Sequence, residues 1–152
     1  MVLRSAKEMD EATLLKLYSE CTPDLQHVPF PDELKVQLVQ QQFLAERHFV
    51  QTHYPDADVG VIFDEGQPIG RLNVHRGPNG YRVLAIALCP AYRNRGIGTK
   101  LLGDILQEAK DNYKAVRLQA AWHNVSARRW YENLGFKIVE DKGVCYEMEW
   151  TP

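Results

Sequence analysis

The chain has 152 residues and a formal net charge of −2, and 45% of its residues are hydrophobic. A domain of this length can bury a core without disulfides or metals to hold it together. The near-neutral charge excludes a general attraction for nucleic acid or anionic membranes, and no apolar run approaches the roughly 20 residues of a membrane span. The N-terminus also lacks the apolar centre of a secretory signal. We therefore expect one domain over residues 1–152, in the cytoplasm, with neither nucleic acid nor membrane as a partner.

The N-terminal third of the chain predicts a short strand and two helices. Residues 2–5 have a strand pattern, and a helix with acidic residues in its first turn is expected over about 10–20. Three prolines between residues 22 and 31 predict a loop. A Gln-rich helix is expected from residue 31 to about 53, because Pro55 ends it. The imperfect apolar face of this second helix consists of Leu34, Leu38, Val39, Phe43 and Val50.

The middle of the chain predicts three strands. Apolar residues alternate over 59–63, a turn is expected at 64–67, and an extended pattern resumes over 69–74. The Gly-Pro-Asn-Gly stretch at 77–80 is typical of a hairpin turn. Residues 83–88 are apolar at every position, which indicates a central strand covered on both faces.

The C-terminal half predicts two helices and three further strands. Apolar residues recur every fourth position from Ile97 to Ala109, as in an amphipathic helix. A strand is expected over 116–122, followed by a short helix over 126–134 that Gly135 closes. A hairpin over 136–150 ends the chain. The order β-α-α-β-β-β-α-β-α-β-β predicts an α/β fold in which a mixed sheet has helices on both faces.

The three cysteines are Cys21, Cys89 and Cys145. Their number is odd, they are widely separated, and they match neither a metal-binding pair nor a disulfide framework. We expect free thiols in a reducing compartment and no metal site. Cys89 precedes Pro90 and has no base partner nearby in the sequence, so we interpret it as a packed residue rather than a nucleophile.

The segment from Arg93 to Gly98 has the features of an anion site. The first amides of a helix lack intrahelical partners and lie at the positive end of the helix dipole. Glycines let a phosphate approach the backbone, and the arginines add positive charge. Pro90 keeps the preceding segment out of helix. A plain helix entry with solvated arginines is the alternative, but the succession of strand, proline, arginines and glycines favours phosphate binding.

Two common nucleotide motifs do not fit this segment. A dinucleotide fingerprint needs a third glycine where the chain has Leu101, and it opens a domain rather than following three strands. A P-loop needs four residues between its glycines and a Gly-Lys-Ser/Thr end, which residues 98–101 do not supply.

The pattern Arg93-x-x-Gly96-x-Gly98 after an apolar strand resembles the acyl-CoA signature of the GNAT superfamily of N-acetyltransferases. About thirty residues downstream, a second segment is similar to another motif of that family, and its matching residues are Asn124, Ala127, Tyr131, Glu132, Gly135 and Phe136. The element order is also the family's order. The resemblance implies a mixed, mostly antiparallel sheet of six to seven strands, splayed between strands 4 and 5.

The resemblance further implies acetyl-CoA as the acyl donor. Its pyrophosphate would be held by backbone amides from Asn94 to Thr99, and its pantetheine arm would lie along the central strand and beside Asn124. The donor-binding residues expected on this basis are Ile86, Ala87, Leu88, Arg93, Asn94, Arg95, Gly96, Ile97, Gly98, Thr99, Asn124 and Tyr131.

The expected reaction is direct attack of a primary amine on the thioester in a ternary complex. A lysine-type amine has a pKa near 10.4, so only about 0.04% of it is neutral at pH 7 and a base is useful. The oxyanion needs a donor, for which the backbone amide near Leu88 is the family-like candidate. Tyr131 is the candidate general acid for the leaving thiolate; packing on a short helix is its structural alternative.

The general base is not identified by the sequence. Many relatives carry an acidic residue on the central strand, where this chain has Ala85. Weak candidates for the base are His75, Tyr81, His123, Asp32 and Glu33. A base that acts through water, or an acceptor of lower pKa, also fits.

The absence of that acid leaves a second function open, a non-catalytic acyl-CoA-binding module. A nucleotide-binding regulatory domain is a third. We expect the acidic, aromatic segment over 21–33 to favour a cationic or amine-bearing substrate. The expected acceptor is an amine of a small molecule or a peptide. The last strand makes a homodimer possible. Trp122, Trp130 and Trp150 are interpreted as core or interface residues.

Overall fold

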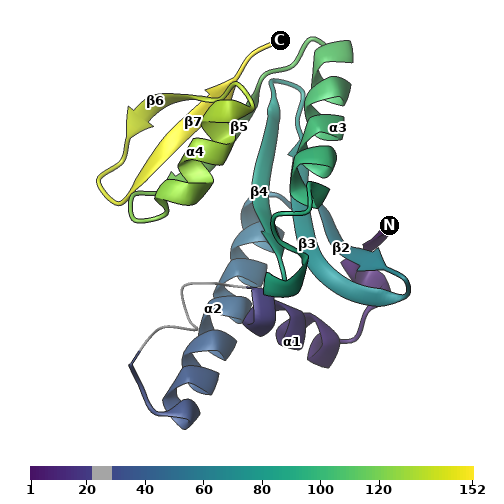
Figure 1. The fold of residues 1–152 in the computed structure, drawn as a ribbon, viewed down its shortest axis with the longest axis vertical. Coiled ribbons are helices and arrows are strands. Elements are labelled where there is room, and N and C mark those ends of the chain that lie inside the picture. Colours follow the sequence, from purple (N-terminus) through teal and green to yellow (C-terminus); the bar gives the residue numbers. More distant parts are fainter. Residues whose placement is uncertain (22–28) are drawn as a thin grey trace. The chain divides into compact units, whose positions relative to one another are not determined.

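The computed structural model describes residues 1–21 and 29–152, so most of the predicted loop at 22–31 lies outside the described residues. Figure 1 shows the elements in the predicted order. We describe two compact units separately: unit 1 comprises Met1–Asn73 and Ala85–Gly98, and unit 2 comprises Val74–Leu84 and Thr99–Pro152. The prediction of a single domain stays a prediction.

The sheet has seven strands in the order β1-β2-β3-β4-β5-β7-β6, so the prediction of a mixed sheet is confirmed. The strands are β1 (Val2–Ser5), β2 (Asp58–Asp64), β3 (Gln67–Arg76), β4 (Tyr81–Leu88), β5 (Val116–Ala121), β6 (Lys137–Asp141) and β7 (Cys145–Trp150). The helices are α1 (Glu11–Cys21), α2 (Asp32–His53), α3 (Ile97–Asp111) and α4 (Val125–Asn133). Strands β4 and β5 run parallel and pair at Tyr81↔Val116 and Arg82↔Arg117. Any separation of these strands further along involves both units and stays a prediction.

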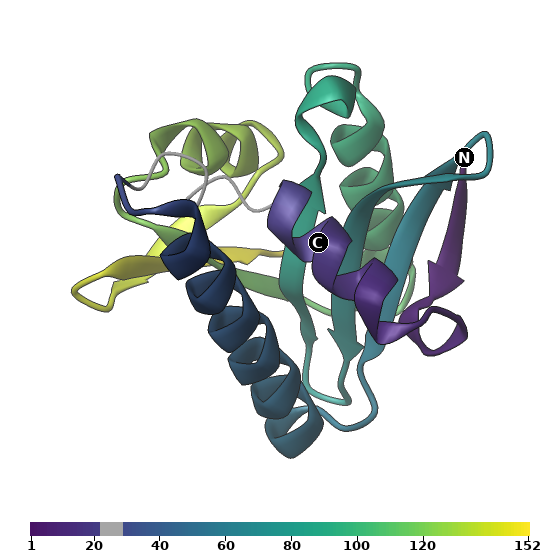
Figure 2. The ribbon, with the colours of Figure 1, turned by 90° about the horizontal axis from the view of Figure 1, so that it is seen from below.

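The core of unit 1 forms where α1 lies across its strands (Figure 2). Ala6, Leu17, Cys21 and Val61 are buried together. The first turns of α2 lie outside the buried clusters, and Leu34 is exposed although the sequence pattern predicted it on the buried face. The buried residues of α2, which has 22 residues, are Val39, Phe43 and Val50, all beyond its first two turns in chain order.

The core of unit 2 is built on the antiparallel strands β5 and β7, and β6 pairs with β7 outside the core. Leu118 and Met148 are paired across β5 and β7 and are both buried. The buried residues of α3 are Leu102, Ile105, Leu106 and Ala109. This face differs from the predicted four-residue spacing because a helix turns every 3.6 residues, so the buried stripe includes positions three apart as well as four.

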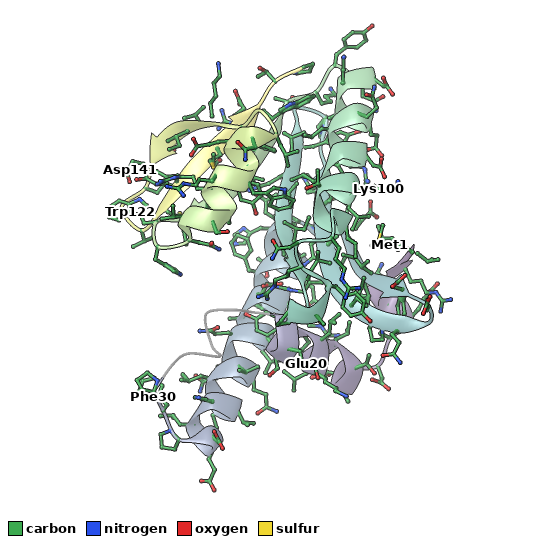
Figure 3. The ribbon with its side chains drawn as sticks, viewed as in Figure 1. Met1, Glu20, Phe30, Lys100, Trp122 and Asp141 are labelled. Atoms are coloured by element: carbon green, nitrogen blue, oxygen red, sulfur yellow. A yellow bond between two sulfur atoms is a disulfide. The ribbon has the colours of Figure 1, made fainter. Side chains whose placement is uncertain are left out.

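Trp122 was interpreted from the sequence as a core or interface residue, and the structure excludes the core. It follows the end of β5, is 43% exposed, and donates from Nε1 to Asp141 Oδ1 at 3.0 Å. Figure 3 shows the two side chains together. An indole that keeps a polar partner at the surface fits its amphipathic character.

The prediction of three free thiols is wrong for two of them. A disulfide joins Cys21, the last residue of α1, to Cys89, which directly follows β4, and the two Cα atoms are 4.3 Å apart. The cysteines are 68 residues apart in sequence, so only the packing of α1 against the strands brings them together. Cys145 is free and half-buried.

Among the described residues, no helix is both long and apolar enough to cross a membrane.

Candidate functional site

The loop between β4 and α3 changes direction through a short sequence of special backbone conformations. A 3₁₀ turn with Pro90 at its first position follows β4, and Arg93 returns to an extended conformation. Asn94 (φ 60°) and Gly96 (φ 79°) then adopt the left-handed conformation immediately before α3 begins. Asparagine and glycine are the residues that adopt this conformation most readily. Consecutive amides in such a loop, at a helix N-terminus, are suited to an anion.

Arg93 holds this loop in place instead of presenting all its donors to solvent. Its Nε donates to the carbonyl of Leu88 at 2.9 Å, and its Nη2 donates to the carbonyl of Cys21 at 3.4 Å. The positive charge remains next to the loop, but the side chain ties the loop to the ends of β4 and α1. Arg95 is exposed, with its guanidinium 5.3 Å from the centre of the Tyr92 ring.

The backbone N–H and C=O groups of β4 point alternately toward β3 and away from it. Cys89 donates its N–H to Ile69 of β3 at 2.8 Å. Because N–H and C=O groups alternate between the two edges of a strand, Ala87 also points toward β3, whereas Ile86 and Leu88 point away from it. The Leu88 carbonyl already accepts from Arg93, so its N–H is the group left for a ligand.

In unit 2, one hydrogen bond joins α4 to the first turn of α3. Trp130 of α4 donates from Nε1 to the hydroxyl of Thr99, in the first turn of α3, at 2.9 Å. Asn124 caps α4 by accepting from the N–H of Ala127 at 3.1 Å. This cap uses only the oxygen of the Asn124 side chain, so its amide nitrogen is not engaged by the cap.

Tyr131 lies in the last turn of α4 and is 8% exposed. Its ring contacts the rings of Trp130 and Phe136, with centroid distances of 5.2 and 5.8 Å. Burial raises the pKa of the Tyr131 phenol to about 12. The group therefore stays protonated at neutral pH and is a hydrogen-bond donor.

Tyr81, one of the base candidates, contacts the C-terminal end of α3. Its hydroxyl accepts from Asn112 Nδ2 at 3.1 Å, and Asn112 directly follows α3. Burial and the neighbouring Glu108 raise the pKa of Tyr81. Its phenol therefore stays protonated at neutral pH and cannot accept a proton from the amine.

The other base candidates occupy three separate elements. His75 is half-buried near the end of β3, beside Gly77 of the following turn. His123 is exposed between β5 and α4, directly before Asn124. Asp32 and Glu33 are exposed in the first turn of α2. Of these, only His123 is adjacent in sequence to a residue of the predicted donor site.

Two buried polar groups were not singled out from the sequence. Glu147 of β7 is 5% exposed and accepts from both terminal nitrogens of Arg82 at 2.9 Å. Asn73 of β3 is 3% exposed, and Arg71 two positions before it pairs with Glu46. The available signal was polar residues at alternate positions, Arg71 and Asn73 in β3 and Glu147 and Glu149 in β7.

The model of the GNAT family of acetyltransferases matches residues 12–136, so the chain belongs to that family. Streptothricin acetyltransferase A of Bacillus subtilis (strain 168) is 29% identical over 110 residues, which cover 64% of this chain and 64% of that protein. An uncharacterised protein of Mycobacterium leprae (strain TN) is 40% identical over 65 residues, which cover 43% of this chain and 18% of that protein. The chain thus spans less than two thirds of the length of either relative.

The fold is shared with solved structures that match nearly the whole chain. PaiA N-acetyltransferase of Thermoplasma acidophilum, in complex with coenzyme A, has a TM-score of 0.76 and 21% identity, with 99% of this chain and 98% of that chain covered. A GNAT family acetyltransferase of Elizabethkingia anophelis with acetyl-CoA bound has a TM-score of 0.63 and 14% identity, with coverages of 99% and 97%. These likenesses show that the chain has the same fold as solved acetyltransferase structures.

Proposed function

We propose that the protein is an N-acetyltransferase that moves the acetyl group of acetyl-CoA to a primary amine of a small molecule or peptide. The observation that carries the proposal is the loop in which Asn94 and Gly96 take the left-handed conformation before α3. Family membership and neighbours with coenzyme A or acetyl-CoA bound support the choice of donor.

In this proposal the backbone amides from Asn94 to Thr99 bind the pyrophosphate, with Gly96, Ile97 and Gly98 between them. Arg93 holds the loop and Arg95 adds charge. Ile86 and Leu88 offer backbone N–H and C=O groups to the pantetheine arm. The backbone groups of Ala87 point toward β3, so Ala87 lies beside the arm without a backbone hydrogen bond to it. Asn124 contributes its amide nitrogen.

The chemical step is direct attack in a ternary complex. The neutral amine forms a nitrogen–carbon bond with the thioester carbonyl, and the N–H of Leu88 stabilises the oxyanion. The carbon–sulfur bond then breaks, and the sulfur leaves with the bonding pair as the coenzyme A thiolate. The amine loses one proton to a base or to water, and the thiolate gains one. The products are the acetylated amine and free coenzyme A.

Tyr131 donates a hydrogen bond to that thiolate. With a pKa of about 12, its phenol is about 3.5 pKa units less acidic than a thiol of pKa near 8.5, so complete proton transfer is uphill by about 5 kcal/mol. Hydrogen bonding to the developing negative charge is therefore its main contribution, and the thiolate can be protonated later from solvent.

A direct experiment incubates the protein with acetyl-CoA and a panel of primary amines and follows both coenzyme A release and the acetylated product by mass spectrometry. His75→Gln, His123→Gln and Glu33→Gln report on the base. Product formation supports the proposal. Binding of acetyl-CoA without product across the panel instead favours the non-catalytic module, which the lack of a carboxylate at Ala85 suggests. Stabilisation by NAD or ATP but not by coenzyme A points to a nucleotide-binding domain.

We also propose that the protein acts in the cytoplasm, without a metal, and that a homodimer is compatible with its exposed β6 edge. Size-exclusion chromatography with light scattering tests the oligomeric state.

A further inference from the structure

A buried polar cluster lies on one face of β3 in unit 1. Both terminal nitrogens of Arg71 donate to Glu46 of α2, Nη2 to Oε2 at 3.1 Å, and the guanidinium carbon lies 4.6 Å from the centre of the Tyr18 ring of α1. This end-on ion pair uses the outer edge of the guanidinium. The Nε of Arg71 is buried and, within the described part of the chain, has no hydrogen-bond partner.

Asn73 adds a second unpaired atom to the same face. It lies two residues beyond Arg71, so their side chains leave β3 on the same side. Its Oδ1 is buried and likewise has no partner among the described residues. Unpaired buried polar atoms destabilise a fold and are rare in native proteins. One unpaired donor and one unpaired acceptor, two positions apart on one strand face, therefore indicate a ligand that satisfies both.

The strand that carries these two atoms is the neighbour of the proposed donor strand β4. Gly70, next to Arg71, packs so closely on β4 that an added Cβ would meet the Ala87 carbonyl. The hydrogen bond from the Cys89 N–H to the Ile69 carbonyl sets the antiparallel register and places Arg71 opposite Ala87. Arg71 therefore lies one strand away from Ala87, which stands between the two residues, Ile86 and Leu88, whose backbone we assign to the pantetheine arm.

The chemistry of the cluster selects the kind of group that fits. Glu46 balances the charge of Arg71, so the cluster as a whole is neutral. A carboxylate would suit the Arg71 donor but would face the oxygen of Asn73, and an ammonium would suit Asn73 but would lie beside a guanidinium. A neutral amide presents one carbonyl acceptor and one N–H donor, and it satisfies both atoms.

We infer that Arg71 Nε and Asn73 Oδ1 bind an amide group of the acceptor, so that the preferred substrate is an amine that also carries an amide bond. The inference rests on the proposed acetyl transfer. It assigns substrate recognition to β3, in addition to the segment between α1 and α2.

The test compares two amines with the wild-type protein and with Asn73→Leu, which removes the amide at nearly constant volume. The first amine is Nα-acetyl-L-lysine methylamide, which carries amide groups, and the second is n-butylamine, which has the same kind of amine alone. We expect the wild type to prefer the first. Asn73→Leu should lower kcat/KM for it by about three- to tenfold, mainly through KM. The kcat/KM for n-butylamine and the KM for acetyl-CoA should not change.

Thermal stability supplies a readout that does not depend on turnover. Because Asn73→Leu removes an unpaired buried oxygen, its Tm should equal or exceed that of the wild type. Asn112→Leu is the matched control: it removes an amide that donates to Tyr81 and to the Glu108 carbonyl, so its Tm should fall while its amine preference is kept. A fall in Tm for Asn73→Leu as well means that Oδ1 has a structural partner such as a bound water, and it overturns the inference.

Equal use of the two amines by the wild type, or an equal loss for both in Asn73→Leu, also overturns the inference while leaving acetyl transfer intact. Failure of the wild type to acetylate any amine refutes the proposed function instead. In that case, isothermal titration of the two amines into the protein with coenzyme A still decides whether Asn73 recognises an amide.

Discussion

Replacement of Tyr131 by phenylalanine tests the proposed transfer step most directly. The ring of Tyr131 packs between Trp130 and Phe136, and phenylalanine keeps those contacts. The variant therefore loses only the hydroxyl, and its Tm should stay within about 1 °C of the wild-type value, because the loss falls on the transition state rather than on the fold.

The size of the effect follows from the charge on the partner. A hydrogen bond to a charged group contributes about 1.5–3 kcal/mol, which corresponds to a loss of about 10- to 150-fold in kcat. Full proton transfer from a phenol with a pKa of about 12 is unfavourable, so turnover should fall without being abolished.

The assay measures kcat by thiol release from acetyl-CoA and, separately, from an acetyl thioester whose thiol is more acidic. A better leaving group needs less stabilisation, so the defect of Tyr131→Phe should shrink with the second donor. An equal defect with both donors, or no defect with acetyl-CoA, refutes the role of Tyr131 at the leaving sulfur.

Three further changes test the loop and the fold. Gly96→Ala should weaken coenzyme A binding about fivefold in calorimetric titration, because alanine is strained at φ 79°. Gly66 has the same φ and equally open surroundings, so Gly66→Ala should lower the free energy of unfolding by a similar amount but leave coenzyme A binding unchanged. Arg93→Lys should raise the KM for acetyl-CoA about tenfold, because one ammonium cannot replace a guanidinium that donates to the carbonyls of both Leu88 and Cys21. Arg95→Lys is the control and should leave this KM unchanged, and an equal rise in KM for both variants would contradict the anchoring role of Arg93. Hydrogen bonds from Arg82 hold the pKa of Glu147 below its ordinary value, so ionised Glu147 stabilises the fold above about pH 4.5, and this contribution is lost as pH falls through the lowered pKa. Glu147→Gln should therefore lower the free energy of unfolding by about 1.5–3 kcal/mol at pH 7 and by nothing in acid. A difference that does not depend on pH would argue against the ion pair.

Local patterns in the sequence were sufficient to predict the fold. The strands and helices each carry their own periodicity, and turns such as residues 77–80 are marked by glycine and proline. The loop at Arg93 to Gly98 was also predictable as an anion site, because its glycines and the following helix are contiguous in the chain.

The features that sequence reasoning missed all depend on partners distant in the chain. The disulfide of Cys21 with Cys89 requires α1 to end beside β4. The sequence indicated only the charge of Arg93 and not its anchoring of the loop, because the carbonyl of Cys21, which accepts from it, is 72 residues away. The exposure of Trp122 depends on Asp141, nineteen residues on, which gives the indole a polar partner outside the core.

The anchoring of Arg93 has a consequence for how the sequence can change. Both acceptors of its side chain are main-chain carbonyls, which every amino acid possesses. The side chain at position 88 can therefore change without loss of its hydrogen bond, provided that the backbone keeps its course, whereas position 21 is also held by the disulfide with Cys89. Mutational tolerance at the anchor should thus be markedly uneven, with Arg93 and Cys21 restricted and position 88 free to vary. Residues bordering the acceptor segment could diversify toward new amines while the loop before α3 keeps its shape.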